Sequence, residues 1–309
     1  MPTNTTKTTT RRKATQEMLS PGHRACAGCG QMVAARTVVN ALGPDTIIAN
    51  STGCLEVTTS PYPMSSWRMP WIHSVFENSA AIASGILAGL KQKGLDKKIK
   101  VVAQGGDGGT FDIGFGLISG MWERNENILF VCYDNEAYSN TGMQASGATP
   151  WGSSTTTTPA GDGPTIDAIG SHQHKKNMVD IALAHRVKYV AQSTAGYIED
   201  IEAKVKKAVE IEGPAYIQIL TPCIPGWKIQ PDEAMKVGRL AAQSGLYPLL
   251  EYENGVLTKV LKTPTERPSA EEYLKLQGRF AHLFKTEQGK EQLKLIQQIA
   301  DANIERYGL

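Results

Sequence analysis

Residues 99–116 read IKVVAQGGDGGTFDIGFG, an apolar run followed at once by a glycine-rich turn. The run is rich in β-branched residues and predicts a strand, and the apolar spacing that follows predicts a helix over 112–124. Glycines let a backbone come close to a phosphate, and a helix N-terminus offers unpaired N–H groups. This strand, turn and helix therefore indicate a phosphate site in a fold that alternates strands with helices.

The same alternation continues on both sides of this unit. Further strands are predicted at 46–50, 127–133, 187–192 and 215–220, and further helices at 77–94, 178–186 and 199–211. Strands that alternate with helices predict an α/β fold with a mainly parallel sheet flanked by helices.

The two ends of the chain differ from this pattern. Residues 1–19, with almost no large apolar side chains, predict a disordered tail, and 20–227 form the expected binding domain. Residues 228–309 predict a hairpin with its turn at Asn254-Gly255, followed by a helix that opens with a Ser269–Glu272 capping box. We expect them to be a C-terminal extension packed on the same domain or on a partner.

Composition narrows the class of protein. The 309 residues are 41% hydrophobic and 20% charged, an ordinary balance for a chain that buries a core. The net charge of +2 gives no reason to expect nucleic acid or an anionic membrane as partner, and no apolar run reaches the roughly 18–20 residues of a membrane span. Five cysteines without a secretory signal make a disulfide framework unexpected, so we predict a cytoplasmic protein.

An aspartate stands inside the glycine-rich turn. Asp107 lies between Gly106 and the pair Gly108-Gly109. A carboxylate repels a pyrophosphate unless a divalent cation lies between them, and Mg²⁺ held by one or two protein oxygens and by phosphates is the usual arrangement. A second ligand is expected at the end of the next strand, where Asn135 stands. The alternative is a plain glycine turn with a capping aspartate.

The paired motif resembles the signature of thiamine diphosphate enzymes, in which Gly-Asp-Gly is followed one strand later by an asparagine. The resemblance implies that the Asp107 carboxylate, the Asn135 side chain and the backbone carbonyl of Ala137 hold Mg²⁺. It also implies that Gly106, Gly108 and Gly109 lie beside the diphosphate.

Four cysteines lie outside the predicted strands. Cys26 and Cys29 form a C-x-x-C pair in RACAGCGQ, Cys54 follows the first strand and Cys223 the last. Zinc, a redox dithiol and an iron–sulfur cluster are all open. Zinc ribbons usually carry two compact C-x-x-C pairs, and a dithiol would leave two of these cysteines without a role. Cys132 lies within a predicted strand and is expected in the core.

A parallel sheet would bring several of these residues together. Cys54, Asp107, Asn135 and Cys223 would all follow the carboxyl ends of strands, the edge at which open α/β sheets bind their ligands. Four thiolates holding a [4Fe–4S] cluster beside a carbanion-forming cofactor would provide an exit for electrons.

Seven stretches carry a closer resemblance: PGHRACAGCG, STGCLEVTTSPYP, WIHSVFENSAAIASGI, GGDGGTFDIG, YDNEAYSNTGMQASGATPWG, TPCIPGW and EEYLKLQGRF. Over most of 20–285 the chain resembles the beta subunits of the pyruvate:ferredoxin oxidoreductase (pyruvate synthase) family, in the 2-oxoacid:ferredoxin oxidoreductase superfamily. The resemblance implies a thiamine-diphosphate-binding fold. It also implies that Asn140 reaches towards the substrate, and that a [4Fe–4S] cluster is held by Cys26, Cys29, Cys54 and Cys223.

The resemblance also implies a reaction, the CoA-dependent oxidative decarboxylation of a 2-oxo acid with ferredoxin as electron acceptor. Pyruvate, giving acetyl-CoA and CO₂, is the expected substrate. The alternatives on this scaffold are a branched-chain or aromatic 2-oxo acid (such as phenylglyoxylate) and oxalate. Two other classes are a non-redox thiamine-dependent decarboxylase with structural zinc and a non-catalytic scaffold; the intact Mg²⁺ motif tells against the scaffold.

The implied partners complete the enzyme. An alpha subunit would supply the pyrimidine-facing domain and the activating glutamate, and gamma and ferredoxin-like delta subunits would lead electrons to an external ferredoxin. We therefore expect this chain to be inactive alone and to expose apolar surface where its partner docks.

Overall fold

The strands form one eight-stranded sheet in the computed structural model, which describes residues 17–161 and 169–309. The strand order is β2 (Trp71–His73), β1 (Thr46–Asn50), β3 (Lys100–Gly106), β4 (Leu129–Asp134), β6 (Ala215–Leu220), β5 (Tyr189–Thr194), β7 (Leu250–Glu253) and β8 (Val256–Val260). The pairings from β2 through β5 are parallel, and those of β7 with β5 and with β8 are antiparallel. The predicted α/β class with a mainly parallel sheet is confirmed.

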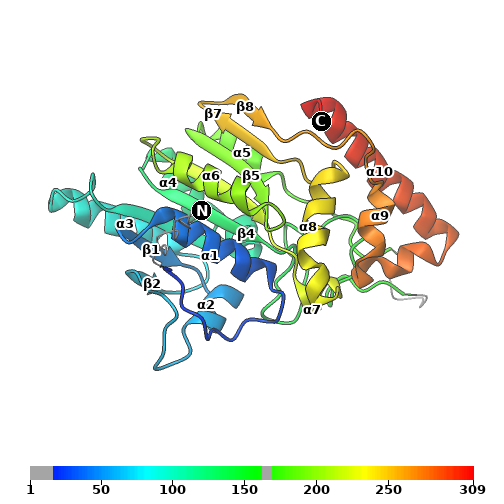
Figure 1. Cartoon of the computed structure of the whole chain (residues 1–309), viewed down its shortest axis with the longest axis horizontal. Helices are drawn as coiled ribbons and strands as arrows, with labels where there is room; N and C mark the ends of the chain where they lie inside the picture. Colours follow the sequence, from blue (N-terminus) through cyan, green and yellow to red (C-terminus); the bar gives the residue numbers. More distant parts are fainter. Residues whose placement is uncertain (1–16, 162–168) are drawn as a thin grey trace, which may run out of the picture.

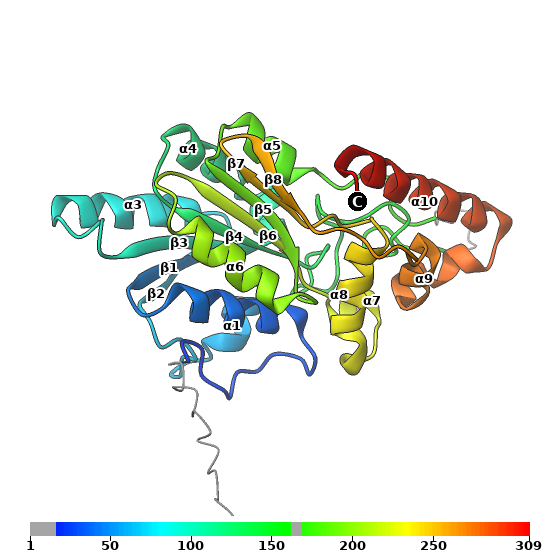
Figure 2. The same ribbon diagram turned by 45° about the horizontal axis from the view of Figure 1, so that its top comes forward.

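Helices cover both faces of the sheet (Figure 2). One face carries α1 (Gly30–Leu42) and α6 (Ile198–Ala208), and the other carries α3 (Ser79–Gln92), α4 (Phe115–Glu123) and α5 (Met178–Ala184). This layering follows from the connections, because a parallel strand pair needs a crossover that returns over one face.

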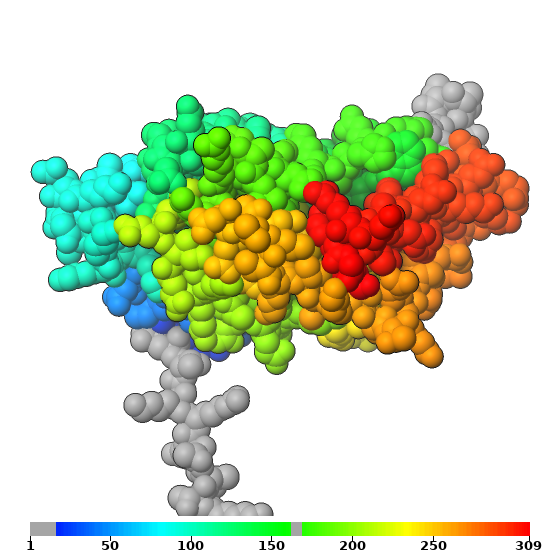
Figure 3. All heavy atoms as spheres, turned by 90° about the horizontal axis from the view of Figure 1, so that it is seen from above, coloured from blue at the N-terminus to red at the C-terminus, as the bar shows by residue number. Residues whose placement is uncertain are grey.

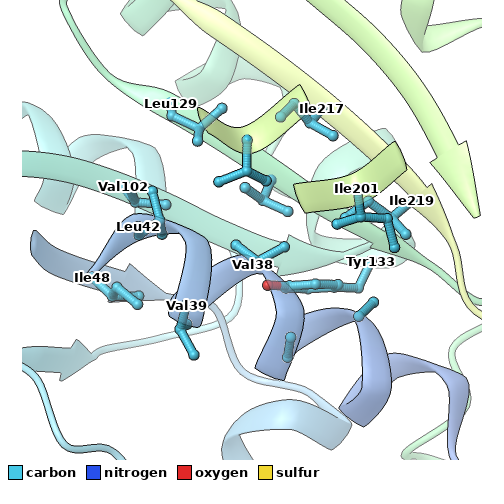
Figure 4. Close-up of a cluster of buried hydrophobic side chains, with 14 of the residues drawn as sticks. Val38, Val39, Leu42, Ile48, Val102, Leu129, Tyr133, Ile201, Ile217 and Ile219 are labelled. Carbon is cyan, nitrogen blue, oxygen red and sulfur yellow. The ribbon is translucent and has the colours of Figure 1, made fainter. Parts of the chain in front are cut away.

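Alternate residues of the central strands supply the two cores between these layers. Figure 4 shows Val39 of α1 near Ile48 and Leu42 of α1 near Val102, and Ile48 and Val102 project from the sheet into the first core. Side chains one position along, such as Cys132, enter the second core. Cys132 is fully buried there, which confirms that it is a core residue.

The C-terminal extension packs against one end of the sheet (Figure 1). Its helical parts, together with α7 (Ile224–Trp227) just before it, enclose a third apolar core. Their bounds are η2 (Pro231–Glu233), α8 (Ala234–Gln243), α9 (Ala270–Lys275), η3 (Gly278–Phe284) and α10 (Glu287–Tyr307). In Figure 3, α10 lies beside the orange hairpin and the green segment that precedes α5. The indole N–H of Trp151 donates to Gln292 of α10 at 2.9 Å.

The predicted C-terminal helix is shorter than expected. Its capping box between Ser269 and Glu272 is present, but α9 ends at Lys275 and the chain continues in the 3₁₀ segment η3. At this break Gly278 packs so closely on Lys228 that a Cβ would come within 2.7 Å of that side chain. Tertiary contact therefore ends the helix where the local sequence would allow it to continue.

Other elements were not expected. The helices α1 and α2 (Cys54–Thr59) flank the cysteines, and β2 is only three residues long.

The expected tail needs a correction at its end, because Met18 and Leu19 are buried and Leu19 bridges to Trp67. Residues 1–16 lie outside the described part of the chain. No helix in the described ranges is long and apolar enough to cross a membrane.

Candidate cofactor site at the carboxyl edge of the sheet

The strands β1, β3, β4 and β6 are neighbours and parallel, so their carboxyl ends meet at one edge of the sheet. The turns that follow these strands carry the residues predicted from the sequence. A cavity at this edge is lined by Cys54, Asp107, Asn135, Ala137 and Asn140, among others. The topology thus brings together candidates that come from distant parts of the chain.

The glycine-rich turn forms a π-helical segment, η1 (Gly108–Asp112), before α4 begins. The Tyr138 ring lies on this turn, and a Cβ at Gly108 would come within 2.2 Å of the ring. The hydroxyl of Tyr138 donates to the Asp112 carboxylate at 2.8 Å. The glycine thus permits two loops of the site to pack together, in addition to allowing the predicted close approach of a phosphate.

Asp107 is fixed at the end of β3 by two hydrogen bonds. Its side chain is almost fully buried; Oδ2 accepts a hydrogen bond from Ser146 Oγ at 2.5 Å, and Oδ1 accepts one from the Asn135 N–H at 3.2 Å. Burial raises the pKa of Asp107 to about 8, repulsion from Asp134 adds to the rise, and the Ser146 hydrogen bond opposes it. A cation beside the carboxylate would stabilise its charged form.

Three oxygens converge beside Asp107. The side-chain oxygen of Asn135 lies 3.0 Å from Asp107 Oδ1 and 2.7 Å from the carbonyl oxygen of Ala137. Either the amide turns its NH₂ group inward, or a cation lies between the oxygens. Octahedral Mg²⁺ with bonds of 2.0–2.1 Å separates adjacent ligand oxygens by about 2.9 Å. With the Asn135 amide oxygen turned inward the three predicted ligands would fit Mg²⁺, and with its NH₂ group inward they form hydrogen bonds instead.

The C-x-x-C loop packs directly against the turn after β6. The Gly30 N–H donates to the Pro222 carbonyl at 3.2 Å, and the Cys29 N–H closes a turn onto the Cys26 carbonyl at 3.2 Å. A Cβ at Gly28 would come within 2.3 Å of the Pro231 oxygen. The small residues around the cysteines thus allow this loop to lie beside Cys223.

The four thiols influence one another electrostatically. Burial raises the pKa of Cys29 and of Cys223, and it raises that of Cys54 to about 12, with the neighbouring thiols adding to each rise. Among residues 17–161 and 169–309, no group of three or more His, Cys, Asp or Glu side chains is gathered closely enough to hold a metal ion. Cationic iron would stabilise the thiolate forms of these cysteines.

A short segment after β4 connects the oxygen site with the thiols. Ser139 Oγ donates to the Asn135 side-chain oxygen at 2.9 Å, and a hydrogen bond with Ser139 opposes the burial that raises the pKa of Cys223. Asn140 lines the cavity and opposes the rise in the pKa of Cys54 that burial causes. Ser139 and Asn140 therefore lie between the candidate oxygen ligands and the thiols.

Several supporting residues could not be predicted from the sequence. Ser146 lies in a long irregular segment, and Trp227, whose indole N–H donates to the Asn135 carbonyl at 2.8 Å, follows the last cysteine. Trp227 lies in TPCIPGW, one of the stretches on which the family resemblance rests. That stretch alone does not show what Trp227 contacts. The sequence signal that could have pointed to Trp227 was its position close to Cys223, a candidate cluster ligand.

The fold and the site define the class of protein as a thiamine diphosphate-binding domain. The family model described as "Thiamine pyrophosphate enzyme, C-terminal TPP binding domain" matches residues 51–219, more than half of the chain. A solved 2-oxoglutarate:ferredoxin oxidoreductase from Magnetococcus marinus shares the fold, with a TM-score of 0.56 and 23% identity over 84% of this chain and 87% of that chain.

Two curated relatives are more similar in sequence. The chain is 48% identical to the pyruvate synthase subunit PorB of Methanocaldococcus jannaschii, over 95% of this chain and 97% of that protein. It is 42% identical to the ketoisovalerate oxidoreductase subunit VorB of Pyrococcus abyssi, over 87% of each. The chain belongs to the PorB family of thiamine diphosphate-binding beta subunits of 2-oxoacid:ferredoxin oxidoreductases, as the sequence resemblance predicted.

Proposed function

We propose that this chain is the beta subunit of a pyruvate:ferredoxin oxidoreductase, which converts pyruvate, CoA and oxidised ferredoxin into acetyl-CoA, CO₂ and reduced ferredoxin. One observation carries the proposal. The three candidate Mg²⁺ ligands line one cavity with Cys54, and Cys223 follows β6 at the same sheet edge, next to the C-x-x-C loop. An oxidative thiamine enzyme needs a carbanion site and an electron acceptor side by side.

Each group of residues has a separate task in this proposal. When bound, thiamine diphosphate would supply a nucleophilic ylid carbon and a thiazolium ring that acts as an electron sink, and a [4Fe–4S] cluster would supply a one-electron acceptor. Asp107, Asn135 and the Ala137 carbonyl would hold Mg²⁺, with Gly106, Gly108 and Gly109 beside the diphosphate. Asn140, which lines the cavity, would contact the substrate, and the four cysteines Cys26, Cys29, Cys54 and Cys223 would hold the cluster.

The choice of pyruvate depends on the relatives. PorB is named for pyruvate synthase, whereas VorB, named for a ketoisovalerate oxidoreductase, is still 42% identical to this chain. A branched-chain 2-oxo acid is therefore the second candidate substrate. Reduction of ferredoxin by the purified complex, with CoA and either pyruvate or 2-ketoisovalerate, tests the choice directly.

The proposal includes partner subunits. The relatives are named as subunits, and we propose an alpha subunit that supplies the activating glutamate, together with gamma and ferredoxin-like delta subunits and an external ferredoxin. The segment between α2 and β2 supports a docking surface, because Tyr62 is 96% and Met64 58% exposed there. We propose a cytoplasmic location, where thiols stay reduced.

Anaerobic visible and EPR spectra of the purified protein, before and after dithionite, test the electron path. We expect visible absorption that bleaches on reduction and the EPR signal of a reduced cluster, and we expect Cys54→Ser and Cys223→Ser to lose both. Cys132→Ala is the matched control, since Cys132 lies in the core. A colourless protein with stoichiometric zinc would contradict the oxidoreductase proposal and leave the thiamine site standing.

A further inference from the structure

Glu136 stands between two of the candidate Mg²⁺ ligands and has an unusual backbone conformation. Its φ is 64°, in the left-handed region that residues with a Cβ rarely adopt. β4 ends at Asp134, and the chain turns at Glu136. This turn brings the Asn135 side-chain amide within 2.7 Å of the Ala137 carbonyl. A strained conformation at such a place persists only when its surroundings hold it.

The side chain of Glu136 points away from the cofactor cavity into a buried group of charges. It is 5% exposed; one carboxylate oxygen accepts a hydrogen bond from Lys175 Nζ at 2.8 Å and the other accepts one from the Arg279 guanidinium at 2.5 Å. The Glu136 N–H donates to Asp134 at 3.1 Å, and its carbonyl accepts from Thr149 at 2.8 Å. Hydrogen bonds thus hold both the backbone and the side chain of this residue.

Arg279 belongs to η3 in the C-terminal extension and is almost fully buried. Its guanidinium lies 3.9 Å from the centre of the Trp227 ring, and Gln277 accepts a hydrogen bond from its Nε at 3.0 Å. The indole N–H of Trp227 in turn donates to the carbonyl of Asn135. The extension therefore contacts the ligand-bearing turn through both Arg279 and Trp227.

Lys175 completes the charge balance. It lies on the long segment before α5 and also pairs with Asp134 at 2.5 Å. Two cations and two carboxylates therefore neutralise one another behind the metal site. Charge-assisted hydrogen bonds of this kind fix geometry strongly, and removal of Arg279 would leave the buried Glu136 carboxylate with Lys175 as its one ion-pair partner in the described ranges.

We propose that Glu136, held by Arg279 and Lys175, is a positioning residue that preorganises the Mg²⁺ site, so that the C-terminal extension sets the metal affinity of the domain. This inference rests on the Mg²⁺–thiamine diphosphate site of the proposed function. Groups behind metal ligands commonly change metal affinity by about 10–100-fold when they are altered.

The test is a titration of the purified complex with Mn²⁺ in place of Mg²⁺, in the presence of thiamine diphosphate, with free Mn²⁺ followed by EPR. We expect Arg279→Met and the nearly isosteric Glu136→Gln each to raise the dissociation constant of Mn²⁺ by about 10–100-fold. Raised Mg²⁺ should restore turnover in both variants. If Arg279 and Glu136 only stabilised the fold, raised Mg²⁺ would not restore turnover.

Lys204→Met is the matched control. Lys204 is 2% exposed and pairs with Asp200 at 2.6 Å, so its loss also disrupts a buried ion pair, but on α6. We expect a lower melting temperature and unchanged Mn²⁺ affinity. Affinities within about twofold of wild type in Arg279→Met and Glu136→Gln, or an equal loss in Lys204→Met, would overturn the inference. A wild-type complex that binds no Mn²⁺ would instead overturn the proposed metal site itself.

Discussion

Asp107 uses its two carboxylate oxygens differently. Oδ2 accepts a hydrogen bond from the Ser146 hydroxyl, whereas Oδ1 accepts one from the Asn135 N–H and lies 3.0 Å from the Asn135 side-chain amide. A carboxylate held in this way presents one defined oxygen to a cation, which suits the strict octahedral geometry of Mg²⁺. Ser146 therefore contributes to the site although it touches no proposed ligand of the metal other than Asp107.

This role of Ser146 can be tested by Ser146→Ala. The change removes a hydrogen bond of 2.5 Å that holds the carboxylate and opposes the rise in the pKa of Asp107 caused by burial. Mg²⁺ should therefore bind about 10–100-fold more weakly in the presence of thiamine diphosphate. Isothermal titration of the complex measures the affinity.

The control for this experiment is Ser153→Ala. Ser153 is also buried, and its hydroxyl has no hydrogen-bond partner within the described ranges. We expect its removal to leave Mg²⁺ affinity unchanged. Equal affinities for the two variants would show that Ser146 does not orient Asp107.

At the scale of elements, η3 joins the extension to the site. It carries Arg279 and also His282, whose Nε2 lies 3.1 Å from the Ile169 carbonyl. The sequence suggests an ordinary amphipathic helix here, yet the 3₁₀ segment directs Arg279 inward. The packing of this segment therefore affects both stability and the geometry behind the metal ligands.

His282 makes this element sensitive to acid. Burial lowers the pKa of His282 below its ordinary value of 6.5, so the unfolded chain binds the proton more readily than the folded one. The free energy of unfolding should therefore fall as the pH drops below about 6.5, and the fall should be smaller in His282→Gln. Denaturant titrations at a series of pH values measure this slope. The same slope in both proteins would contradict the prediction.

The elements also show how far sequence reasoning reaches. The β-branched runs at 46–50 and 215–220 match β1 and β6 residue for residue, because buried parallel strands carry an unbroken apolar signal. By contrast, β2 has three residues, too few for any period to show. The break at Gln277 depends on contact with Lys228 and has no local signal.

The residues of the site also divide into those that the sequence predicts and those that it does not. Asp107 and Asn135 could be predicted because each directly follows a strand, and parallel topology brings strand ends together. Ser146, Glu136 and Arg279 could not, since their contacts depend on how a long loop and a C-terminal segment fold over the edge. Periodicity describes which face a residue occupies but not which distant residue it meets.

At the scale of the whole molecule, the sheet has two unlike edges. The β2 edge lies next to the segment between α2 and β2, where Tyr62 is 96% exposed, and the opposite edge ends in β8. The cofactor cavity is lined by Cys54 at the start of α2 and by Phe76 beyond β2. A partner that completes the cavity should therefore contact the side of the molecule that carries Tyr62.

This placement predicts opposite results for two exposed apolar residues. Tyr62→Asp puts a charge into the proposed contact, where an unpaired charge is costly to bury, so the partner subunits should no longer co-purify with the chain. Val256→Asp, at a residue 64% exposed on β8, should leave assembly intact. Co-purification with the partner subunits and size-exclusion chromatography of the product measure both. Intact assembly of Tyr62→Asp would place the partner elsewhere, and loss of assembly in Val256→Asp would place it on the β8 edge.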